Sequence, residues 1–457
     1  MAAGGVVEEP PRRTPVLAEA DLVVLGGGPA GLAAAVAGAR QGARTVLVER
    51  YGFLGGMGTA GGVTNFAGLY GRRGGVMQRL VRGVVDELLE RIDRLGGLNA
   101  PQDGLQGRIR VHSYDIPAYM CAADELLASA GVQIVFHALA CGVSMADAHR
   151  IDALIVETRE GRRALRAREF IDASGDGDLA HHAGVPWDYG DGAGGALYPS
   201  TMARIGGVDA AQALPAVGEF AAIDRLMQAA AGRYRFGRRG AILRPQRNPS
   251  EWRANVTQLA GADGRAVNAL EVDALSAAEV EGRRQIVEYL RFLRAEVPGF
   301  AQAELVALPA QVGVRESRRI RGEYALTGED VLSGARFADV IGLNAWPIEV
   351  HAEGRIDWAF PRDPENAYHH LPLRMLVPQR VDNLLVAGRC ASMEHLGQAA
   401  ARVSGGCFAM GQAAGTAAAL RLNGHADLLA SAVVAELQAR LRADGVDLDD
   451  PTPPQAP

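Results

Sequence analysis

LVVLGGGPAGLAAAVAGAR, the stretch from Leu22 to Arg40, decides how the front of this chain folds. An apolar run meets Gly26-x-Gly28-x-x-Gly31, and an alanine-rich segment follows. Strand, tight glycine turn and helix in this order are the fingerprint of a dinucleotide-binding βαβ unit. A second apolar run, TVLVE, ends at Glu49, close to the spacing expected for the acidic residue that binds the adenosine ribose hydroxyls. We therefore predict a bound dinucleotide.

The segments that follow favour a flavin dinucleotide. After Glu49 the chain runs RYGFLGGMGTAGG, where a NAD enzyme would continue into its next helix. Such a glycine-rich loop can bring backbone N–H groups against more of the pyrophosphate or against a flavin ring; the alternative is a mobile surface loop. Further strands are predicted in VQIVFHALACGV, ALIVET, REFIDASGDGDLA and VDNLLVAGRC. Their ends would meet at one crevice of a doubly wound sheet.

The same glycine pattern occurs again in GDGAGG, which begins at Gly190. Here Pro186, Trp187 and Asp188 precede it in place of a strand, and no helix follows. We predict a loop at this position.

Composition excludes several classes of protein. A chain of 457 residues is too long for one ordinary core and suggests two or more compact units, or one with insertions. The net charge is −6 with scattered basic residues, which argues against nucleic-acid binding. All 47 basic residues are Arg, so lysine Schiff bases and the P-loop lysine are excluded.

The cysteines and the chain ends point to a cytoplasmic protein. The cysteines share no metal-ligand spacing, so we expect buried reduced thiols and no metal at Cys121, Cys141, Cys390 and Cys407. The start has no signal-peptide pattern and is predicted to be a disordered leader. The tail from Asp449 is predicted to be disordered as well.

A second uncharged stretch, VSGGCFAMGQAAGTAAAL, lies between Arg402 and Arg421. Its length and its Gly411-to-Gly415 spacing are those of a packed membrane helix. It consists mostly of Ala, Gly, Ser, Thr and Gln, whereas membrane insertion favours Leu, Ile, Phe and Val. We therefore predict no membrane span.

Several of these motifs together resemble the FAD-dependent oxidoreductase family, flavoproteins of the glutathione-reductase type. They are GGGPAG with Glu49, FLGGMGTAGG, FIDASGDGDLA, VGVRESRRIRGEYALTGEDV and NLLVAGRCASMEHLGQAAARVSGGCFAMGQAAG. The terminal segment is more distantly similar to the flavoprotein subunit of fumarate reductases and succinate dehydrogenases. There an Arg before a glycine pair contacts the substrate carboxylate, and the matching position is Arg402, before Gly405 and Gly406.

The resemblance implies an α/β fold, in which an inserted α+β substrate domain interrupts a Rossmann-like FAD-binding domain. The expected parts are a leader (1–19), FAD-binding segments (20–186 and 375–424), the substrate domain (187–374) and a C-terminal helix, from about Leu428 to Ala443, with a tail (425–457). It also implies that VSGGCFAMGQAAGTAAAL is a helix packed closely on the first βα unit. The partial positive charge of its N-terminus would stabilise the reduced flavin ring.

The motifs and the resemblance together predict the residues that bind FAD. They are Gly26, Gly28, Pro29, Ala30, Gly31, Glu49, Arg50, Gly55, Gly56, Met57, Ala140, Ser174, Gly175, Asp176, Gly388, Arg389, Gly405 and Gly406. No His occurs in ERYGFLGGMGT, so we expect non-covalent FAD. No CxxC or CxxxxC accompanies the first glycine motif, which excludes disulfide reductase chemistry.

Catalytic candidates come mainly from YHHLPLRMLVP, which precedes the last flavin strand and is expected to cross into the cleft. Tyr368, His369 and His370 are candidates for proton transfer, because imidazole titrates near neutral pH. The alternative is one buried, hydrogen-bonded His and one exposed His. His395 is a further candidate, since the resemblance places its segment beside the flavin.

RESRRIRGEY, from Arg315 to Tyr324, alternates positive and negative charges. Such a pattern is typical of a solvated ion-pair face. The alternative is that Arg315 or Arg319 faces the cleft and contacts a carboxylate or the flavin.

We expect a dehydrogenase or oxidase that transfers hydride from a small organic substrate, with a carboxylate among the options, to flavin N5. Dioxygen or another acceptor would then reoxidise the flavin. A monooxygenase or reductase using external NAD(P)H, a nucleic-acid-modifying flavoprotein and a non-redox flavoprotein are the alternatives. Neither a nucleic-acid nor a membrane partner is expected, and a homo-oligomer remains open.

Overall fold

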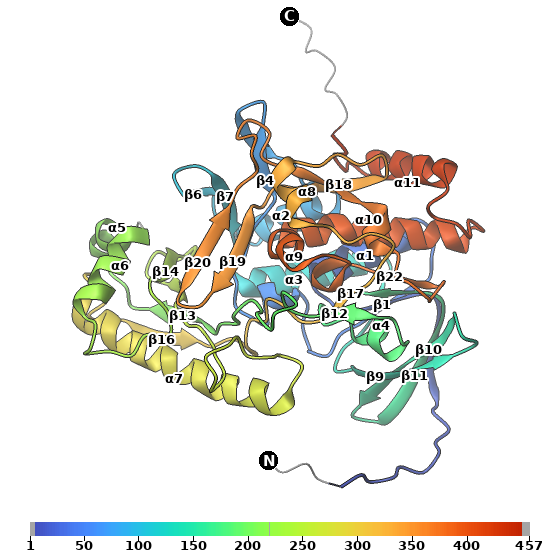
Figure 1. The fold of residues 1–457 in the computed structure, drawn as a ribbon, viewed down its shortest axis with the longest axis horizontal. Coiled ribbons are helices and arrows are strands. Elements are labelled where there is room, and N and C mark those ends of the chain that lie inside the picture. The colour runs from blue at the N-terminus through green and yellow to red at the C-terminus, as the bar shows by residue number, and fades with distance from the viewer. Residues whose placement is uncertain (1–4, 219, 450–457) are drawn as a thin grey trace, which may run out of the picture.

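A computed structural model describes residues 5–218 and 220–449, and its centre is a seven-stranded sheet (Figure 1). The strands run in the order β8-β2-β1-β11-β10-β9, and β22 also pairs with β11. Their bounds are β1 (Val16–Leu25), β2 (Thr45–Val48), β8 (Gln133–Val135), β9 (Leu139–Met145), β10 (Ile151–Thr158), β11 (Gly161–Asp172) and β22 (Leu384–Val386). The fold is therefore mixed α/β with a Rossmann-like sheet, as predicted.

The five strands β8, β2, β1, β11 and β22 are parallel, whereas β9 and β10 add an antiparallel edge. Apolar runs such as Val23 and Val24 are fully buried, as expected of a sheet covered on both faces. Because the strands are parallel, their carboxyl ends share one edge of the sheet. The chain segments that follow β1, β2, β11 and β22 therefore meet there.

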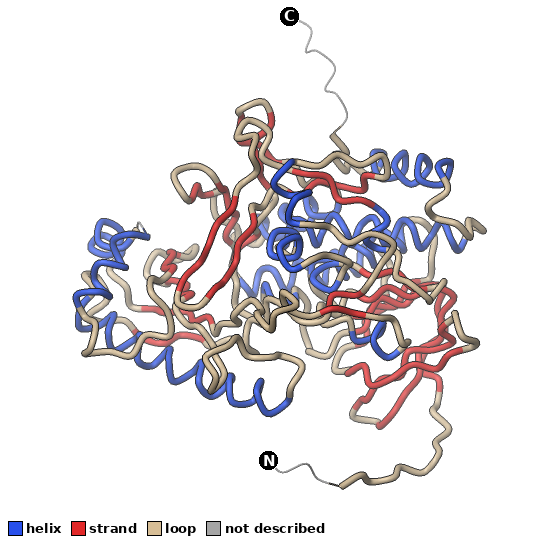
Figure 2. The backbone as a smooth tube through the Cα atoms, in the orientation of Figure 1, coloured by secondary structure: helices blue, strands red, loops and turns tan. Residues whose placement is uncertain are grey.

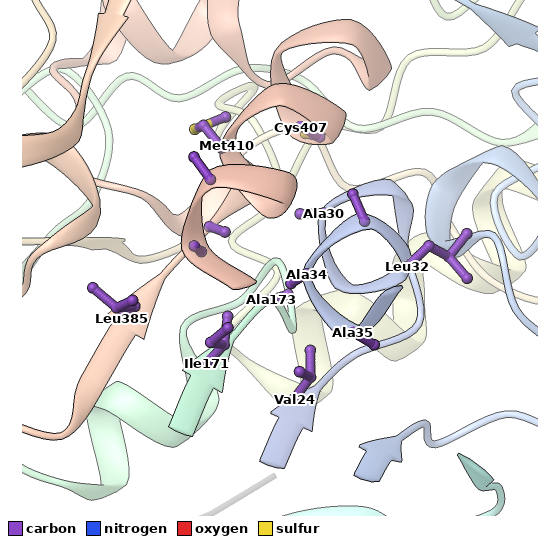
Figure 3. Packing of buried hydrophobic residues seen from close by; sticks show 14 of the residues in the cluster. Val24, Ala30, Leu32, Ala34, Ala35, Ile171, Ala173, Leu385, Cys407 and Met410 are labelled. Atoms are coloured by element: carbon purple, nitrogen blue, oxygen red, sulfur yellow. The ribbon is translucent and has the colours of Figure 1, made fainter. Parts of the chain in front are cut away.

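Two helices from opposite ends of the chain, α1 (Pro29–Arg40) and α10 (Ser404–Leu422), pack on each other. Figure 3 shows Ala30 and Ala34 between the two helices, above Val24 and Ile171 of the sheet. A Cβ on Gly411 would lie 2.0 Å from the Ala30 carbonyl oxygen. One on Gly415 would lie 2.2 Å from the Ala34 carbonyl oxygen. The predicted close contact of α10 with the first βα unit is confirmed, and the small residues permit it.

The structure corrects the predicted start of the sheet. Residues from Val16 onward belong to β1 instead of a disordered leader, because their backbone pairs with the first half of β11. The predicted single strand VQIVFHALACGV is divided into β8 and β9. His137 between them has φ 55°, and this left-handed backbone interrupts the pairing.

Between β2 and β8 lies a segment that folds over the carboxyl edge of the sheet. It begins with the 3-10 helix η1 (Gly56–Gly58) in the glycine-rich loop. It continues with β3 (Asn65–Phe66), β4 (Tyr70–Arg73), β5 (Val76–Arg79), α2 (Val84–Arg94), β6 (Gln102–Gly104), β7 (Ile109–Ser113) and α3 (Ile116–Ser129). Helices α2 and α3 pack on each other and on α1.

A second core lies between Ala203 and Ala303, in the left part of Figure 1. Its antiparallel sheet has the order β14-β15-β13-β16, and the long helix α7, at the lower left of Figure 2, packs against it in the same core. The bounds are β13 (Met202–Gly206), α5 (Ala210–Val217), α6 (Phe220–Ala229), β14 (Ile242–Pro245), β15 (Trp252–Asn255), α7 (Val272–Glu296) and β16 (Glu304–Ala307). Trp252, Tyr289, Phe292 and Phe300 fill this core.

Shorter elements join the two cores. They are α4 (Asp178–His182), β12 (Trp187–Asp188), β17 (Arg319–Ile320), α8 (Gly328–Ser333), β18 (Val340–Asn344), β19 (Ile348–Ala352), β20 (Arg355–Ala359), β21 (His369–Pro372), η2 (Leu373–Leu376), η3 (Gly388–Cys390) and α9 (His395–Ala401). The strands form the pairs β12–β17, β18–β21 and β19–β20. GDGAGG is a loop, as predicted.

The closing helix α11 spans Ser431–Ala443 and begins three residues later than predicted, because Leu428 is buried in the preceding loop. Asp449 accepts hydrogen bonds from Tyr368 and pairs with His370, so it is not part of a disordered tail; the rest of the predicted tail lies outside the described residues. Cys390 and Cys407 are buried as predicted, but Cys141 is only half-buried and Cys121 is exposed. Among the described helices none is long and apolar enough to cross a membrane.

Candidate functional site

A large cavity lies at the carboxyl edge of the parallel strands. Its lining includes Gly26 after β1, Glu49 after β2, Ser174 after β11 and Gly388 after β22. The same cavity extends to β13, β14 and β15 of the second core. The four strand ends predicted from sequence therefore surround one site.

Backbone forms much of the wall at the glycine turn. Gly26 has φ +100°, and a Cβ there would lie 2.5 Å from the Ala173 carbonyl oxygen, so only glycine fits. A Cβ on Gly56 would lie 2.8 Å from Cα of Gly28. The fingerprint turn and the glycine-rich loop thus approach each other closely through backbone at Gly28 and Gly56, where a ligand can reach N–H groups without meeting a side chain of either glycine.

Two helix N-termini border this cavity. Helix α1 begins after Gly28 and α10 begins after Val403, and neither helix has a side-chain cap. Uncapped N–H groups and the helix dipole favour an anion, such as a pyrophosphate at α1. The start of α10 is fixed by Ser404, whose hydroxyl accepts a hydrogen bond from the Ala67 N–H at 2.9 Å.

The Glu49 carboxylate is held in place by backbone groups. Gly27 N–H donates to Oε2 at 2.7 Å, and Tyr51 N–H donates to Oε1 at 3.0 Å. The carboxylate lines the cavity and retains free acceptor positions for hydroxyl groups. This geometry fits the ribose contact predicted for Glu49.

Arg50, Asp176 and Arg389 form a charged group behind the strand ends. Arg389 Nη2 lies 2.8 Å from Asp176 Oδ1, and Arg50 Nη1 lies 3.7 Å from Oδ2. Burial alone would raise the pKa of Asp176, but the two guanidinium groups lower it below its ordinary value. The nearby Asp178 has its pKa raised to about 6 by burial and by the charge of Asp176.

Most of the predicted FAD-binding residues line this cavity, namely Gly26, Gly28, Pro29, Ala30, Glu49, Arg50, Gly56, Met57, Ala140, Ser174, Gly175, Gly388 and Arg389. The others, Gly31, Gly55, Asp176, Gly405 and Gly406, do not. The glycines of this second group serve close packing or turns. For example, a Cβ on Gly31 would lie 1.7 Å from the Gly26 carbonyl oxygen, and one on Gly405 would lie 2.3 Å from the Gly68 carbonyl oxygen.

The segment YHHLPLRMLVP does not cross into the cavity, so the structure does not support Tyr368, His369 and His370 as catalytic residues. It forms β21, which pairs with β18. His369 is fully buried, its Nε2 lies 2.9 Å from Nδ2 of Asn344, and burial lowers its pKa to about 4. Tyr368 and His370 bond the carboxylate of Asp449. These contacts are structural.

His395 also lies outside the cavity lining. Its Nδ1 lies 3.0 Å from Oε2 of Glu316, a fully buried carboxylate that also pairs with Arg319. RESRRIRGEY is therefore no solvated face, since Arg315, Glu316 and Arg319 are all buried. Arg315 lines the cavity and Arg319 does not.

The residues that sequence reasoning missed lie on β15 and β19. Arg253, Glu349 and His351 line the cavity together with Arg315 and Arg402, and we call these five residues the arginine cluster. Glu349 and His351 alternate with apolar residues in IEVHA, a period of two that places both on one face of β19. This alternation is the local sequence pattern that could have placed Glu349 and His351 on one face of a strand.

Hydrogen bonds fix part of the arginine cluster. His351 Nε2 lies 3.0 Å from Glu349 Oε1, and Trp346 Nε1 donates to Oε2 at 3.0 Å. Arg315 Nη1 donates to the Tyr198 carbonyl oxygen at 2.6 Å. Arg402 differs: Nη2 is 4.0 Å from Glu349 Oε2, and within the described chain neither Nε nor Nη2 has a hydrogen-bond partner.

The charges of the cluster act on one another. Burial and the charge of Arg402 lower the pKa of Arg315 to about 9. Burial and Arg315 lower the pKa of His351 to about 3, so the imidazole is neutral. Burial would raise the pKa of Glu349, but His351 and Arg402 lower it well below its ordinary value. The cluster thus holds three guanidinium groups and one carboxylate, an arrangement that favours an anionic ligand.

Comparison with known proteins gives a family match over most of the chain. Residues 21–441 match the family described as FAD dependent oxidoreductase. No curated protein matches the chain. A geranylgeranyl bacteriochlorophyll reductase-like protein from Thermoplasma acidophilum is similar in structure, with 13% identity, a TM-score of 0.46 and coverage of 94% of this chain and 84% of that one.

Two further solved structures are similar at the same level. One is p-nitrophenol 4-monooxygenase from Pseudomonas putida DLL-E4, with 12% identity, a TM-score of 0.45 and coverage of 96% of this chain and 91% of that one. The other is anhydrotetracycline hydroxylase from Streptomyces rimosus, with 15% identity, a TM-score of 0.46 and coverage of 93% and 66%.

Proposed function

Because the chain belongs to the FAD dependent oxidoreductase family, and is therefore an FAD-using enzyme, we propose that it oxidises a small organic substrate that carries a carboxylate. FAD, when bound, supplies a two-electron oxidant that accepts hydride from a substrate C–H bond. Dioxygen or another acceptor then takes the electrons. The FAD-binding part is of the glutathione-reductase type, and residues of the second core contribute to the substrate side.

The cavity has the features that non-covalent FAD requires. The uncapped start of α1 suits the pyrophosphate, and Glu49 suits the adenosine ribose. The backbone contact between Gly28 and Gly56 forms a cradle that a Cβ would fill. In the described chain His351 is the one histidine that lines the cavity, and it belongs to the arginine cluster. These observations support a cofactor held by backbone and by Glu49.

The observation that carries the substrate class is the guanidinium group of Arg402. It lines the cavity, and its Nε and Nη2 have no hydrogen-bond partner among the described residues. A buried donor without a partner costs on the order of 1–3 kcal/mol, more when it is charged. A carboxylate bound beside Arg402 would satisfy both donors and offset the charge of Arg315. Arg402 and Arg315 would bind and orient the substrate, and the surrounding buried side chains would exclude water.

The test is a visible spectrum of the purified protein, followed by anaerobic mixing with amino acids and hydroxy acids. The corresponding esters and amides, which lack the carboxylate, are the controls. Bleaching of the flavin band by an acid but not by its ester supports the proposal. Bleaching only by NADH or NADPH would assign the protein to the monooxygenase or reductase alternative, and bleaching by the neutral compounds alone would exclude the carboxylate.

A further inference from the structure

We propose that His351, positioned by Glu349, is the group that takes the proton from the substrate. This inference rests on the proposed function. The histidines suggested by the sequence, His369, His370 and His395, lie outside the cavity lining.

Glu349 and His351 lie on the same face of β19, and both side chains line the cavity that also holds Arg315 and Arg402. His351 is buried, so bulk water does not compete for its ring. A substrate bound to the two arginines would therefore lie beside the imidazole.

Glu349 fixes the orientation of the His351 ring. Glu349 is a carboxylate, and its Oε1 lies 3.0 Å from His351 Nε2, so it accepts the Nε2–H bond. This leaves the lone pair on Nδ1, which has no hydrogen-bond partner in the described part of the chain. Trp346 Nε1 donates to the other carboxylate oxygen at 3.0 Å and fixes Glu349 in turn. A carboxylate that orients an imidazole is a recurrent arrangement for a base.

The charges of neighbouring side chains act on the His351 ring. The groups that face His351 are Arg315, Glu349 on β19 and Arg402 at the end of α9. In the free enzyme burial and Arg315 keep the imidazole neutral, so it can accept a proton. A substrate carboxylate would offset the charges of Arg315 and Arg402 and raise the pKa of the ring. His351 would thus become a stronger base when the substrate is bound.

The proposed step oxidises an alcohol or amine carbon. FAD, when bound, would supply the oxidant that accepts the hydride with the C–H electron pair, and His351 Nδ1 would accept the proton from the substrate O–H or N–H bond. A C=O or C=N bond forms. The proton on Nδ1 leaves to solvent after product release.

The test compares FAD-loaded His351→Asn with the wild type, using the compound that reduces the wild-type flavin. His182→Asn, an exposed histidine on α4, is the matched control. We expect His351→Asn to bind FAD normally and to be reduced at least about 100-fold more slowly, the usual effect of losing a general base. Added imidazole should restore part of the rate. His182→Asn should behave as the wild type does.

A second readout does not depend on turnover. Protein labelled with [15N]histidine should show one resonance that is absent in His351→Asn, neutral between pH 5 and 8 and protonated on Nε2. Glu349→Gln should shift the tautomer towards Nδ1 and slow reduction, whereas a purely structural Glu349 would leave the tautomer unchanged. A charged His351 at pH 7, or a proton on Nδ1, would overturn the inference.

The two proposals can fail separately. If no compound in the panel reduces the wild type, the proposed function is wrong and this inference falls with it. If His351→Asn is reduced as fast as the wild type, only the assignment of His351 is wrong.

Discussion

At the scale of one residue, the guanidinium group of Arg402 has two buried nitrogens without a hydrogen-bond partner among the described residues. The sequence placed Arg402 before the glycine pair, but only the structure shows that Nε and Nη2 are buried without a hydrogen-bond partner in the described chain. The distance of 4.0 Å between Nη2 and Glu349 Oε2 is too long for a hydrogen bond. In the proposed function, a substrate carboxylate satisfies these two donors.

We predict that Arg402→Gln keeps FAD but binds the carboxylate substrate about 10- to 100-fold more weakly, since a charged hydrogen bond contributes about 1.5–3 kcal/mol. The dissociation constant from anaerobic flavin titration measures the effect. Arg355→Gln, an exposed arginine of β20, is the control and should bind as the wild type does. Equal weakening for the neutral amide of the substrate would contradict the role of Arg402.

Glu169 on β11 gives a prediction about pH at the same scale. It is buried against Arg421, and burial raises its pKa from 4.5 to about 7. The folded protein thus holds this proton more tightly than the unfolded chain, so the free energy of unfolding falls as pH rises from about 4.5 to 7. The loss is on the order of 3 kcal/mol, at 1.36 kcal/mol for each pKa unit.

We expect Glu169→Gln to lose this part of the pH dependence. Melting temperatures of variant and wild type at pH 5 and pH 8 measure it, and the difference should favour the variant more at pH 8. Glu160→Gln, at the exposed turn before β11, is the matched control. A constant difference between variant and wild type at both pH values would show that Glu169 does not titrate in this window.

At the scale of elements, the contact between α1 and α10 holds both helix starts at the cavity. We predict that Gly411→Ala destabilises the protein by about 1–3 kcal/mol, because its Cβ would lie 2.0 Å from the Ala30 carbonyl oxygen. FAD affinity should fall as well, since both helix N-termini border the site. Melting temperature and FAD titration measure the two effects.

Gly142→Ala on β9 is the control for Gly411→Ala, because its Cβ would meet only Ile155 Cβ at 3.9 Å. It should leave both quantities close to the wild type. If Gly411→Ala lowers the melting temperature but not FAD affinity, the helix contact is structural only.

At the scale of the whole molecule, the sequence predicted the glycine-rich part of the site and the cavity residues Arg315 and Arg402, but not Arg253, Glu349 and His351. The glycine turn, Glu49 and the strand ends are each encoded within a short stretch, so their positions on a parallel sheet follow from their order. Arg253, Glu349 and His351 belong to no such motif. They join Arg315 and Arg402 through contacts between segments far apart in sequence, such as the pairing of β15 with β13 and the hydrogen bond from Arg315 to the Tyr198 carbonyl oxygen. Periodicity gives the face of a strand but not its partner.

The cavity draws its lining from both cores, so we predict that FAD stabilises the molecule as a whole. A ligand at 1,000 times its dissociation constant adds about 4 kcal/mol to the native state. Calorimetry of apoprotein with increasing FAD should show melting temperatures that rise with FAD concentration for the whole transition. An increase confined to one of two separate transitions would mean that FAD contacts one core only.

The pairing of β22 with β11 and of α10 with α1 also has a consequence for synthesis of the chain. Helix α1 and strand β11 leave the ribosome much earlier than their partners, because α10 and β22 both lie near the end of the described chain. Until then, the apolar side of α1 and the free edge of β11 stay exposed to solvent and to other nascent chains. A ribosome-stalled chain that ends before Leu384 should therefore be degraded readily by protease, while the full-length chain resists it.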